Sequence, residues 1–389
     1  MISFSYYAPT KILFGLGSVN QIGKEAKELG RRALLVHGSN KSSHSVTYER
    51  IRRILENDGI ELFDFDGVIP NPTTEVVTEG ASIAKDNNVD MVIGIGGGSA
   101  MDTAKAIAVE STHSGSAFDY LFYTDGPTSK TLPIIAVGTT AGTGSQVTPC
   151  SVITNTKDKN KSAIWNVNIF PKVAIVDPEL TASMPANVTA QTGFDAFCHN
   201  FEAYISKNTN PLVEAMAIDG IKIIAQQLPI AIRDGRNIEA RSQMAWADTL
   251  GGLTNASGGV TLPHGLGMQV GGHCPKVTHG QSLAIIYPQF TRFTWRSSIQ
   301  KFAAVGRIFN STLEQEPDEV AAEMSCKAID DFLKEIGLWI GFKDLGVTHD
   351  DIYEIAECGH VLNDYKNNPR VASIEEMHEL LDACYERRE

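Results

Sequence analysis

Over its first half the chain alternates short apolar runs with longer amphipathic segments, and this alternation constrains the fold more than any other feature. Short apolar runs bounded by glycine or polar residues are typical of buried strands, whereas apolar residues recurring every three or four positions indicate helices. Strand-like runs occupy residues 33–37, 60–65, 91–95, 132–137 and 173–176. Helix-like segments occupy residues 46–58 and 76–87, and another begins at about residue 101. Strands separated by helices of this length predict right-handed βαβ units and a parallel sheet.

The pattern changes after residue 177, where helical periodicities dominate and strand-like runs almost vanish. The helix-like segments of this half cover residues 190–206, 211–227, 238–255, 281–296, 298–309, 318–336 and 374–387. Because 389 residues are too many for one compact core, two domains are expected. We predict an α/β domain over residues 1–180 and an all-helical domain over residues 181–389.

Composition and charge narrow the class of protein. Hydrophobic residues make up 42% and charged residues 20%, which is ordinary for a soluble globular enzyme. The net charge of −13 argues against a nucleic-acid partner, although backbone N–H groups at a helix start can still hold a phosphate. The six cysteines are scattered without a CxxC pair, which fits reduced thiols. Neither a signal-peptide pattern nor a run of about 18 apolar residues occurs, so we expect a cytoplasmic protein with no membrane segment.

A glycine-rich segment, IGIGGGSAMDTAK at residues 93–105, joins a strand-like run to a helix-like one. Glycine lets the backbone approach a pyrophosphate closely, and the start of a helix supplies oriented N–H donors with partial positive charge. Asp102 falls in the first turn, where its carboxylate suits the helix dipole. The alternative is a ligand-free turn, but the position directly after a buried strand favours a phosphate-binding loop.

A second loop, VGTTAGTGSQVT at residues 137–148, is dense in glycine, serine and threonine. Hydroxyl and exposed N–H groups at that density can wrap a ribose or a phosphate. The loop could instead be a flexible surface segment. Because it follows an apolar strand, we expect it at the carboxyl end of the sheet, where ligands bind in open α/β folds.

The predicted helical domain carries a carboxylate and several histidines with the spacing of metal ligands. Asp195 and His199 are four residues apart, so on a helix they share one face and can bind one ion. Such a pair is often only a structural hydrogen bond, but His264 and His279 each stand beside a glycine near an expected helix start. One carboxylate and three imidazoles suit a catalytic Fe²⁺ or Zn²⁺ with an open position. His273, close in sequence to these candidates, could take part in proton transfer.

Taken together, these motifs resemble the iron-containing alcohol dehydrogenase family. The resemblance rests on GGGSAMDTAK, GTTAGTGSQVT, GFDAFCHNFEAYIS, PHGLG, THG and a late NPR, which occur in this order between about residues 6 and 370. It implies a Rossmann-like parallel-sheet domain followed by an all-helical domain, with the active site in the interdomain cleft. It also implies transfer of a hydride between NAD(P)(H) and a small alcohol or aldehyde. A homodimer is the default expectation for such an enzyme.

Motif matching with this family assigns individual residues. Its metal ligands fall on Asp195, His199, His264 and His279, with Fe²⁺ favoured and Zn²⁺ as the other choice. Its cofactor contacts fall on Gly96, Gly97, Gly98, Ser99, Asp102, Thr139, Thr140 and Thr143. Lys161 resembles a lysine close to the nicotinamide ribose or the phosphates.

Two positions depart from the family pattern. Many members have an aspartate after the first of these strands that binds the adenosine ribose, whereas this chain has His37 followed by Gly38. Without that carboxylate, the expectation leans toward NADP(H), with contacts at Gly38, Ser39 and Lys41. Many members also have a proton-relaying histidine four residues after the third ligand, where this chain has Met268. Because a thioether cannot carry protons, His273, a water or a ribose hydroxyl would have to replace it.

Two other functions remain open on the sequence alone. Metal- and NAD-dependent lyases similar to dehydroquinate synthase share this architecture, but their usual ligands are two histidines and a glutamate. A nucleotide-binding module that has lost catalysis is the second alternative, although all four ligand positions are filled here. The substrate and the direction of the reaction are not readable from these motifs.

Overall fold

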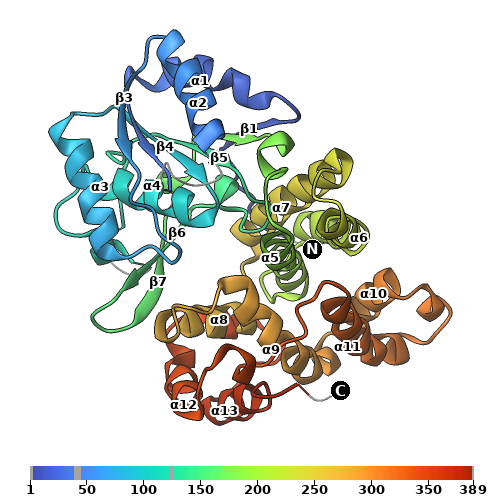
Figure 1. Cartoon of the computed structure of the whole chain (residues 1–389). Helices are drawn as coiled ribbons and strands as arrows, with labels where there is room; N and C mark the ends of the chain where they lie inside the picture. The colour runs from blue at the N-terminus through green and yellow to red at the C-terminus, as the bar shows by residue number, and fades with distance from the viewer. Residues whose placement is uncertain (1–2, 39–44, 122–125, 388–389) are drawn as a thin grey trace. The chain divides into compact units, whose positions relative to one another are not determined.

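The structure is a computed structural model of the chain that describes residues 3–38, 45–121 and 126–387 (Figure 1). It divides into two compact units. The α/β unit comprises Tyr7–Met184 and Arg236–Ala245, and the helical unit comprises Met1–Tyr6, Pro185–Gly235 and Trp246–Glu389. The domain boundary near residue 180 that the sequence suggests stays a prediction.

A six-stranded parallel sheet forms the centre of the α/β unit. Its strands are β1 (Lys11–Phe14), β2 (Arg32–Val36), β3 (Glu61–Phe65), β4 (Met91–Gly96), β5 (Ile134–Gly138) and β8 (Val173–Val176). They lie in the order β1-β8-β5-β4-β2-β3, and every neighbouring pair is parallel. The parallel sheet predicted from the sequence is therefore confirmed.

Helices cover both faces of this sheet, and the alternation of side chains along the strands sets the two faces. Leu35 of β2 packs with helices α1 (Ile22–Leu29) and α2 (Ser45–Asn57), whereas its neighbour Leu34 packs with α3 (Thr74–Asp86) and α4 (Gly98–Glu110). Both leucines are fully buried. Because successive side chains of a strand point to opposite faces, a strand covered on both sides is apolar throughout.

The chain reverses its direction of travel across the sheet beside β2. The strand that follows β2 in sequence is β3 on one side, whereas β4 returns to the other side of β2. Ligands of open α/β sheets bind outside the carboxyl ends of the strands at such a reversal. Here those ends carry Gly38 after β2 and the glycine-rich loop after β4.

A two-stranded antiparallel hairpin, which the sequence pattern did not suggest, extends the α/β unit. It consists of β6 (Cys150–Asn155) and β7 (Asn160–Trp165). Its backbone hydrogen bonds also reach the segment before α3, because the N–H of Thr154 donates to the carbonyl of Pro72 at 2.9 Å.

The helical unit contains no strand among its described residues. Its helices are α5 (Ala186–Ile205), α6 (Pro211–Arg233), α7 (Ile238–Gly258, of which the first turns belong to the α/β unit), α8 (Leu262–His273), α9 (His279–Thr294), α10 (Ile299–Phe309), α11 (Asp318–Glu335), α12 (His349–Glu357) and α13 (Ile374–Asp382). Phe194, Phe197 and Phe201 line one side of α5 and pack against Tyr287 of α9. This aromatic cluster fixes α5 and α9 against each other.

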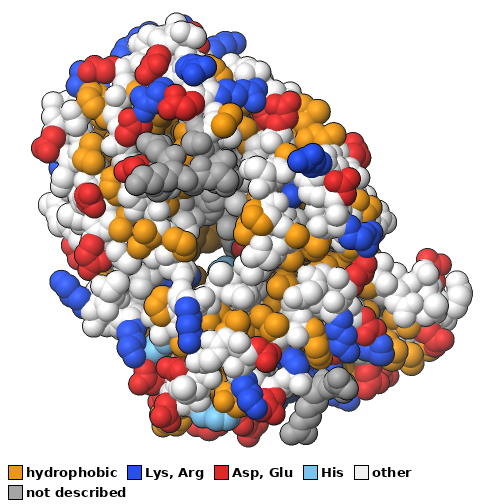
Figure 2. Space-filling model, viewed as in Figure 1, with side chains coloured by type: hydrophobic (Ala, Val, Ile, Leu, Met, Phe, Trp, Pro, Cys, Tyr) orange, Lys and Arg blue, Asp and Glu red, His pale blue; other side chains and the backbone are white. Residues whose placement is uncertain are grey.

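Helix α6 alone among the described residues is long and apolar enough to cross a membrane by length and composition. It packs against α5, and core helices of soluble proteins pass the same test. Figure 2 shows Lys and Arg side chains interspersed with Asp and Glu over the face in view.

Candidate active site

Three histidine side chains of the helical unit surround a single carboxylate oxygen. Oδ1 of Asp195 lies 3.5 Å from Nε2 of His264, 3.7 Å from Nδ1 of His199 and 3.8 Å from Nε2 of His279. The ligand atoms of Asp195, His199 and His264 also lie within 4.8 Å of one another, and all three residues are buried. The structure therefore brings together all four residues that the sequence marks as metal ligands.

Secondary structure explains why these side chains converge. Asp195 and His199 lie one turn apart on α5, opposite its aromatic side, so the helix aims both at the same point. His264 lies in the first turn of α8. Pro263 precedes it, and the fixed backbone angle of proline suits the first turn of a helix. His279 begins α9, which Thr278 caps by accepting a hydrogen bond from the N–H of Gln281.

The donor set fits a divalent cation. Oδ1 of Asp195 and Nε2 of His264 are buried without a hydrogen-bond partner, which is costly for polar atoms unless a ligand satisfies them. Nitrogen and oxygen ligands about 2.1 Å from a tetrahedral centre stand roughly 3.4 Å apart. The observed separations of 3.5–3.8 Å are close to that value.

Electrostatics of this cluster favour positive charge next to the carboxylate. Burial alone would raise the pKa of Asp195, but attraction to the neighbouring histidines lowers it to about 2. Burial would lower the pKa of His264, yet the carboxylates of Glu202 and Asp195 raise it to about 10. A cation bound here would replace a proton that these carboxylates otherwise attract.

Two residues of α8 beyond His264 bear on proton transfer: Met268, which replaces the relay histidine of many family members, and His273, the candidate substitute. Met268 is buried one turn further along the helix. His273 ends the helix, and its ring nitrogens face the carbonyl of Gln269 at 3.0 Å and the carboxylate of Glu354 at 4.0 Å. Nine residues of helix span about 13 Å, so the structure does not bring His273 into the ligand cluster. Its part in catalysis stays a prediction.

The glycine-rich loop of the α/β unit packs against the second loop. A Cβ on Gly97 would lie 3.0 Å from Oγ1 of Thr140, and a Cβ on Gly98 would lie 2.7 Å from Cγ2 of Thr143. Gly97 is the N-cap of α4 and supplies no side chain to bond the first N–H groups of this helix. The first N–H groups of α4 therefore have no side-chain cap, which suits a phosphate, and phosphate binding at this loop stays a prediction.

Asp102 holds the two loops and the hairpin together. Its carboxylate accepts hydrogen bonds from the Ser145 hydroxyl at 2.6 Å and from the N–H of Val152 at 3.1 Å. One turn further along α4, the fully buried Lys105 donates to the carbonyls of Ser145 at 2.7 Å and Cys150 at 2.6 Å. Burial raises the pKa of Asp102 and lowers that of Lys105. The contacts of Asp102 agree with a supporting role.

The other residues predicted to contact the cofactor lie in several elements of the α/β unit. Thr139 is buried, and its N–H donates to the carbonyl of Gly96 at 2.9 Å. Ser99 lies in the first turn of α4. Lys161 of β7 is almost fully buried and donates to the Asn71 side chain at 2.7 Å. Gly38 follows β2, whereas Ser39 and Lys41 lie outside the described residues.

His37 belongs to the segment after β2 where many family members have a ribose-binding aspartate, and its side chain is buried in the α/β unit. Its ring packs on Tyr48 with centroids 4.5 Å apart, and its Nε2 faces Asp64 at 3.4 Å. Nδ1 donates to the carbonyl of Gly38 at 2.7 Å. These contacts hold the His37 ring within the α/β unit, and the choice between NAD and NADP stays a prediction.

Two carboxyl groups near the ligands did not emerge from the sequence. Glu202 bonds His264 directly, and its spacing of three residues after His199 is a signal that could have revealed it. Asp364, in the short 3₁₀ helix Asn363–Asn367, is close enough to His264 and Glu202 to interact electrostatically. Burial raises its pKa to about 7. Neither spacing nor composition marks Asp364.

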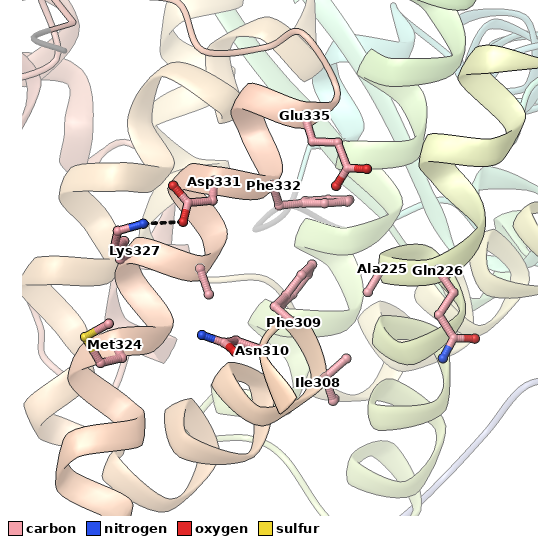
Figure 3. Close-up of a pocket in the computed structure, with 11 residues that line it drawn as sticks. Ala225, Gln226, Ile308, Phe309, Asn310, Met324, Lys327, Asp331, Phe332 and Glu335 are labelled. Carbon is pink, nitrogen blue, oxygen red and sulfur yellow. Dashed lines mark hydrogen bonds and ion pairs between the residues drawn. The ribbon is translucent and has the colours of Figure 1, made fainter. Parts of the chain in front are cut away.

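A separate groove of 320 Å³ in the helical unit has different chemistry (Figure 3). Phe309 of α10 and Phe332 of α11 form part of its wall, with ring centroids 4.9 Å apart. The charged residues on its lining include Lys327 and Asp331, which pair with each other. Its lining residues include no histidine or cysteine, so the candidate site is the Asp195 cluster.

Comparison with known proteins agrees with this geometry. Residues 9–178 match the family model for iron-containing alcohol dehydrogenase, and residues 189–385 match that for the C-terminal part of the Fe-containing alcohol dehydrogenase family. Among curated relatives, the NAD-dependent methanol dehydrogenase of Bacillus methanolicus is 33% identical over 97% of this chain and 98% of its own. The 1,3-propanediol dehydrogenase of Citrobacter freundii is 34% identical, over 98% and 99%.

Solved structures agree as well. A crystal structure of an archaeal halo-thermophilic alcohol dehydrogenase from a Red Sea brine pool is similar, with a TM-score of 0.93 and 33% identity over 99% of each chain. The predicted fold class, a parallel-sheet domain followed by a helical one, is confirmed. A lyase similar to dehydroquinate synthase and a module without catalysis are not favoured.

Proposed function

Because the chain belongs to the iron-containing alcohol dehydrogenase family and is an alcohol dehydrogenase, we propose that it holds its divalent metal on Asp195, His199, His264 and His279. We propose Fe²⁺ as the native metal, with Zn²⁺ as the other choice. The observation that carries this proposal is the approach of three imidazole nitrogens to one oxygen of Asp195, within 3.8 Å.

The residues of the helical unit prepare this site for a metal and a substrate oxygen. A bound divalent cation would supply Lewis acidity toward that oxygen, and a bound dinucleotide would supply the hydride donor or acceptor. Asp195 contributes the single negative charge among the four ligands. Because Asp195, His199 and His264 are buried, water has little access to them, and electrostatic interactions there are strong.

The residues of the α/β unit suit the pyrophosphate of the dinucleotide. The uncapped start of α4 presents N–H donors, and glycine at positions 97 and 98 leaves the backbone accessible. Asp102 keeps this loop in place by its bonds to Ser145 and Val152. We propose contacts from Thr139, Thr140, Thr143 and Lys161 as the family pattern implies.

We propose that the enzyme uses NAD(H) and also accepts NADP(H). The relative from Bacillus methanolicus is named NAD-dependent, which favours NAD(H). The absence of a carboxylate in the segment at residues 36–39 favours acceptance of NADP(H) as well. The ratio of kcat/KM for NADPH and NADH with one aldehyde measures this choice, and a ratio below about 0.01 would contradict use of NADP(H).

We also propose a cytoplasmic homodimer. The six cysteines are scattered and form no disulfide in the structure, which fits a reducing compartment. Light scattering on the purified protein measures the oligomeric state, and a monomer mass of 42.2 kDa would contradict the dimer.

The proposed function is tested by loading the metal-free protein with Fe²⁺ or Zn²⁺ and assaying short alcohols and aldehydes with both dinucleotides. We expect activity that needs the metal and that a chelator removes. A relative named for methanol and another named for 1,3-propanediol make these two compounds the first substrates to try. Full turnover in the metal-free protein would overturn the proposal.

A further inference from the structure

Glu202 is the most completely bonded carboxylate near the candidate metal site. One of its oxygens, Oε1, accepts a hydrogen bond from Nδ1 of His264 at 2.7 Å and another from the Tyr287 hydroxyl at 3.3 Å. The other oxygen, Oε2, accepts from the N–H of Thr261 at 2.7 Å and from its hydroxyl at 3.1 Å. The residue is fully buried. Four donors therefore fix both oxygens.

The position of Glu202 on its helix relates it to the ligands. Asp195, His199 and Glu202 follow one another at intervals of four and three residues, so they share one face of α5. Thr261 and His264 are the N-cap and an early residue of α8. Glu202 thus connects the helix that carries two of the ligands with the start of the helix that carries a third.

We propose that Glu202 is the positioning residue that presents Nε2 of His264 to the metal. A carboxylate only accepts hydrogen bonds, so its contact keeps the proton of the neutral ring on Nδ1 and leaves the lone pair on Nε2. Nε2 is also the atom of this ring that faces Asp195, at 3.5 Å. This inference rests on the proposed metal site.

Charge and rigidity support the same role. A divalent cation together with the carboxylates of Asp195 and Glu202 forms a neutral group, which suits a buried site. The two bonds from Thr261 hold the carboxylate so that it cannot turn away from His264. Partners of this kind orient metal-bound histidines, and their loss typically weakens metal binding by about 10–100-fold.

Replacement Glu202→Gln tests this role because it keeps the shape and removes the charge. A glutamine cannot accept from both His264 and Thr261, since one of its two ends is an NH₂ donor. We expect affinity for Zn²⁺, measured by competition with a chromophoric chelator, to fall 10–100-fold. The visible absorption spectrum of the cobalt(II)-loaded protein should change, because the orientation of one ligand changes.

The matched control is Glu110→Gln in the α/β unit. Glu110 is also a buried helical glutamate, and its carboxylate accepts from the N–H of Ala117 at 2.8 Å. We expect this variant to bind Zn²⁺ like the parent and to keep the parent cobalt spectrum. If Glu202→Gln also keeps the affinity within twofold and the spectrum unchanged, the inference is wrong. If the parent itself binds no metal, the proposed function fails instead.

A second measurement needs no variant and applies if Glu202→Gln does not fold. In the Zn²⁺-loaded parent with ¹⁵N-labelled histidine, a ligand ring bound through Nε2 should retain a proton on Nδ1. That proton should exchange slowly with solvent, because Glu202 and His264 are buried. A loaded protein without any slowly exchanging Nδ1 proton on a ligand histidine would overturn the inference.

Discussion

Replacing His199 by alanine tests the metal centre most directly. His199 is 6% exposed, and its Nδ1 lies 3.7 Å from Oδ1 of Asp195. Four-ligand sites bind Zn²⁺ with an apparent free energy of about 10–16 kcal/mol, so one ligand contributes roughly 3 kcal/mol. Since about 1.4 kcal/mol corresponds to a factor of ten, the loss of one ligand weakens binding by about 100-fold or more.

The replacement should affect the site and spare the helix. Alanine favours helices more than histidine does, so α5 should keep its conformation. Asp195, His264 and His279 would remain, and a water could occupy the vacated position. We therefore expect weaker metal retention, and a fall in kcat of orders of magnitude, because Lewis-acid stabilisation is worth several kcal/mol.

The assay combines metal analysis after dialysis against a weak chelator with turnover of an aldehyde at saturating NADH. His349→Ala serves as the control, because His349 is exposed and pairs with Asp382 on the surface of the same unit. This control should retain both metal and turnover. A His199→Ala protein that did the same would refute the assignment of the ligands.

Three further changes test other parts of the molecule. Gly98→Ala places a Cβ 2.7 Å from Cγ2 of Thr143, so the two loops must separate. We expect the affinity for NADH, measured by fluorescence titration, to fall at least tenfold, while metal binding is unchanged. Asp364 has a pKa raised to about 7, so its folded form keeps a proton that the unfolded chain has lost, and stability declines as pH rises toward 7. Asp364→Asn should therefore raise the unfolding temperature of the metal-free protein more at pH 8.5 than at pH 6; an equal change at both would contradict this. Lys105→Met leaves the carbonyls of Ser145 and Cys150 without their donor, so we expect a loss of about 3 kcal/mol in urea unfolding, and a loss below about 1 kcal/mol would contradict it.

The sequence predicts strands well where both faces of the sheet are covered. Strands β2, β4, β5 and β8 are almost entirely buried, so their apolar runs are continuous. The sequence does not predict strand β1, because this strand lies at the edge of the sheet and both of its end residues are exposed. The hairpin of β6 and β7 is not predicted because its strands, CSVITN and NKSAIW, contain only short apolar runs without regular alternation, and Lys161 is buried within β7.

Helix α8 shows the opposite limit of sequence reasoning. Its sequence, LPHGLGMQVGGH, contains four glycines, which lower helix propensity, so the sequence indicates a helix start near His264 but no helical segment over these residues. The helix forms because nearly all of its residues are buried, and its small residues allow close packing. Gly267, for example, lies where a Cβ would come within 3.0 Å of Oγ of Ser282. Tertiary packing therefore outweighs local propensity at the segment that carries His264.

Periodicity could identify a face of α5 but could not assign a role to each group on it. Asp195, His199 and Glu202 have equivalent spacing, so by sequence alone the glutamate is as good a ligand as the aspartate. The structure separates them by their partners. Oδ1 of Asp195 is buried without a hydrogen bond, whereas both oxygens of Glu202 are occupied by donors from α8 and α9. Those donors lie at least 59 residues further along the chain, so only the fold distinguishes the group that binds the metal from the group that orients its ligand.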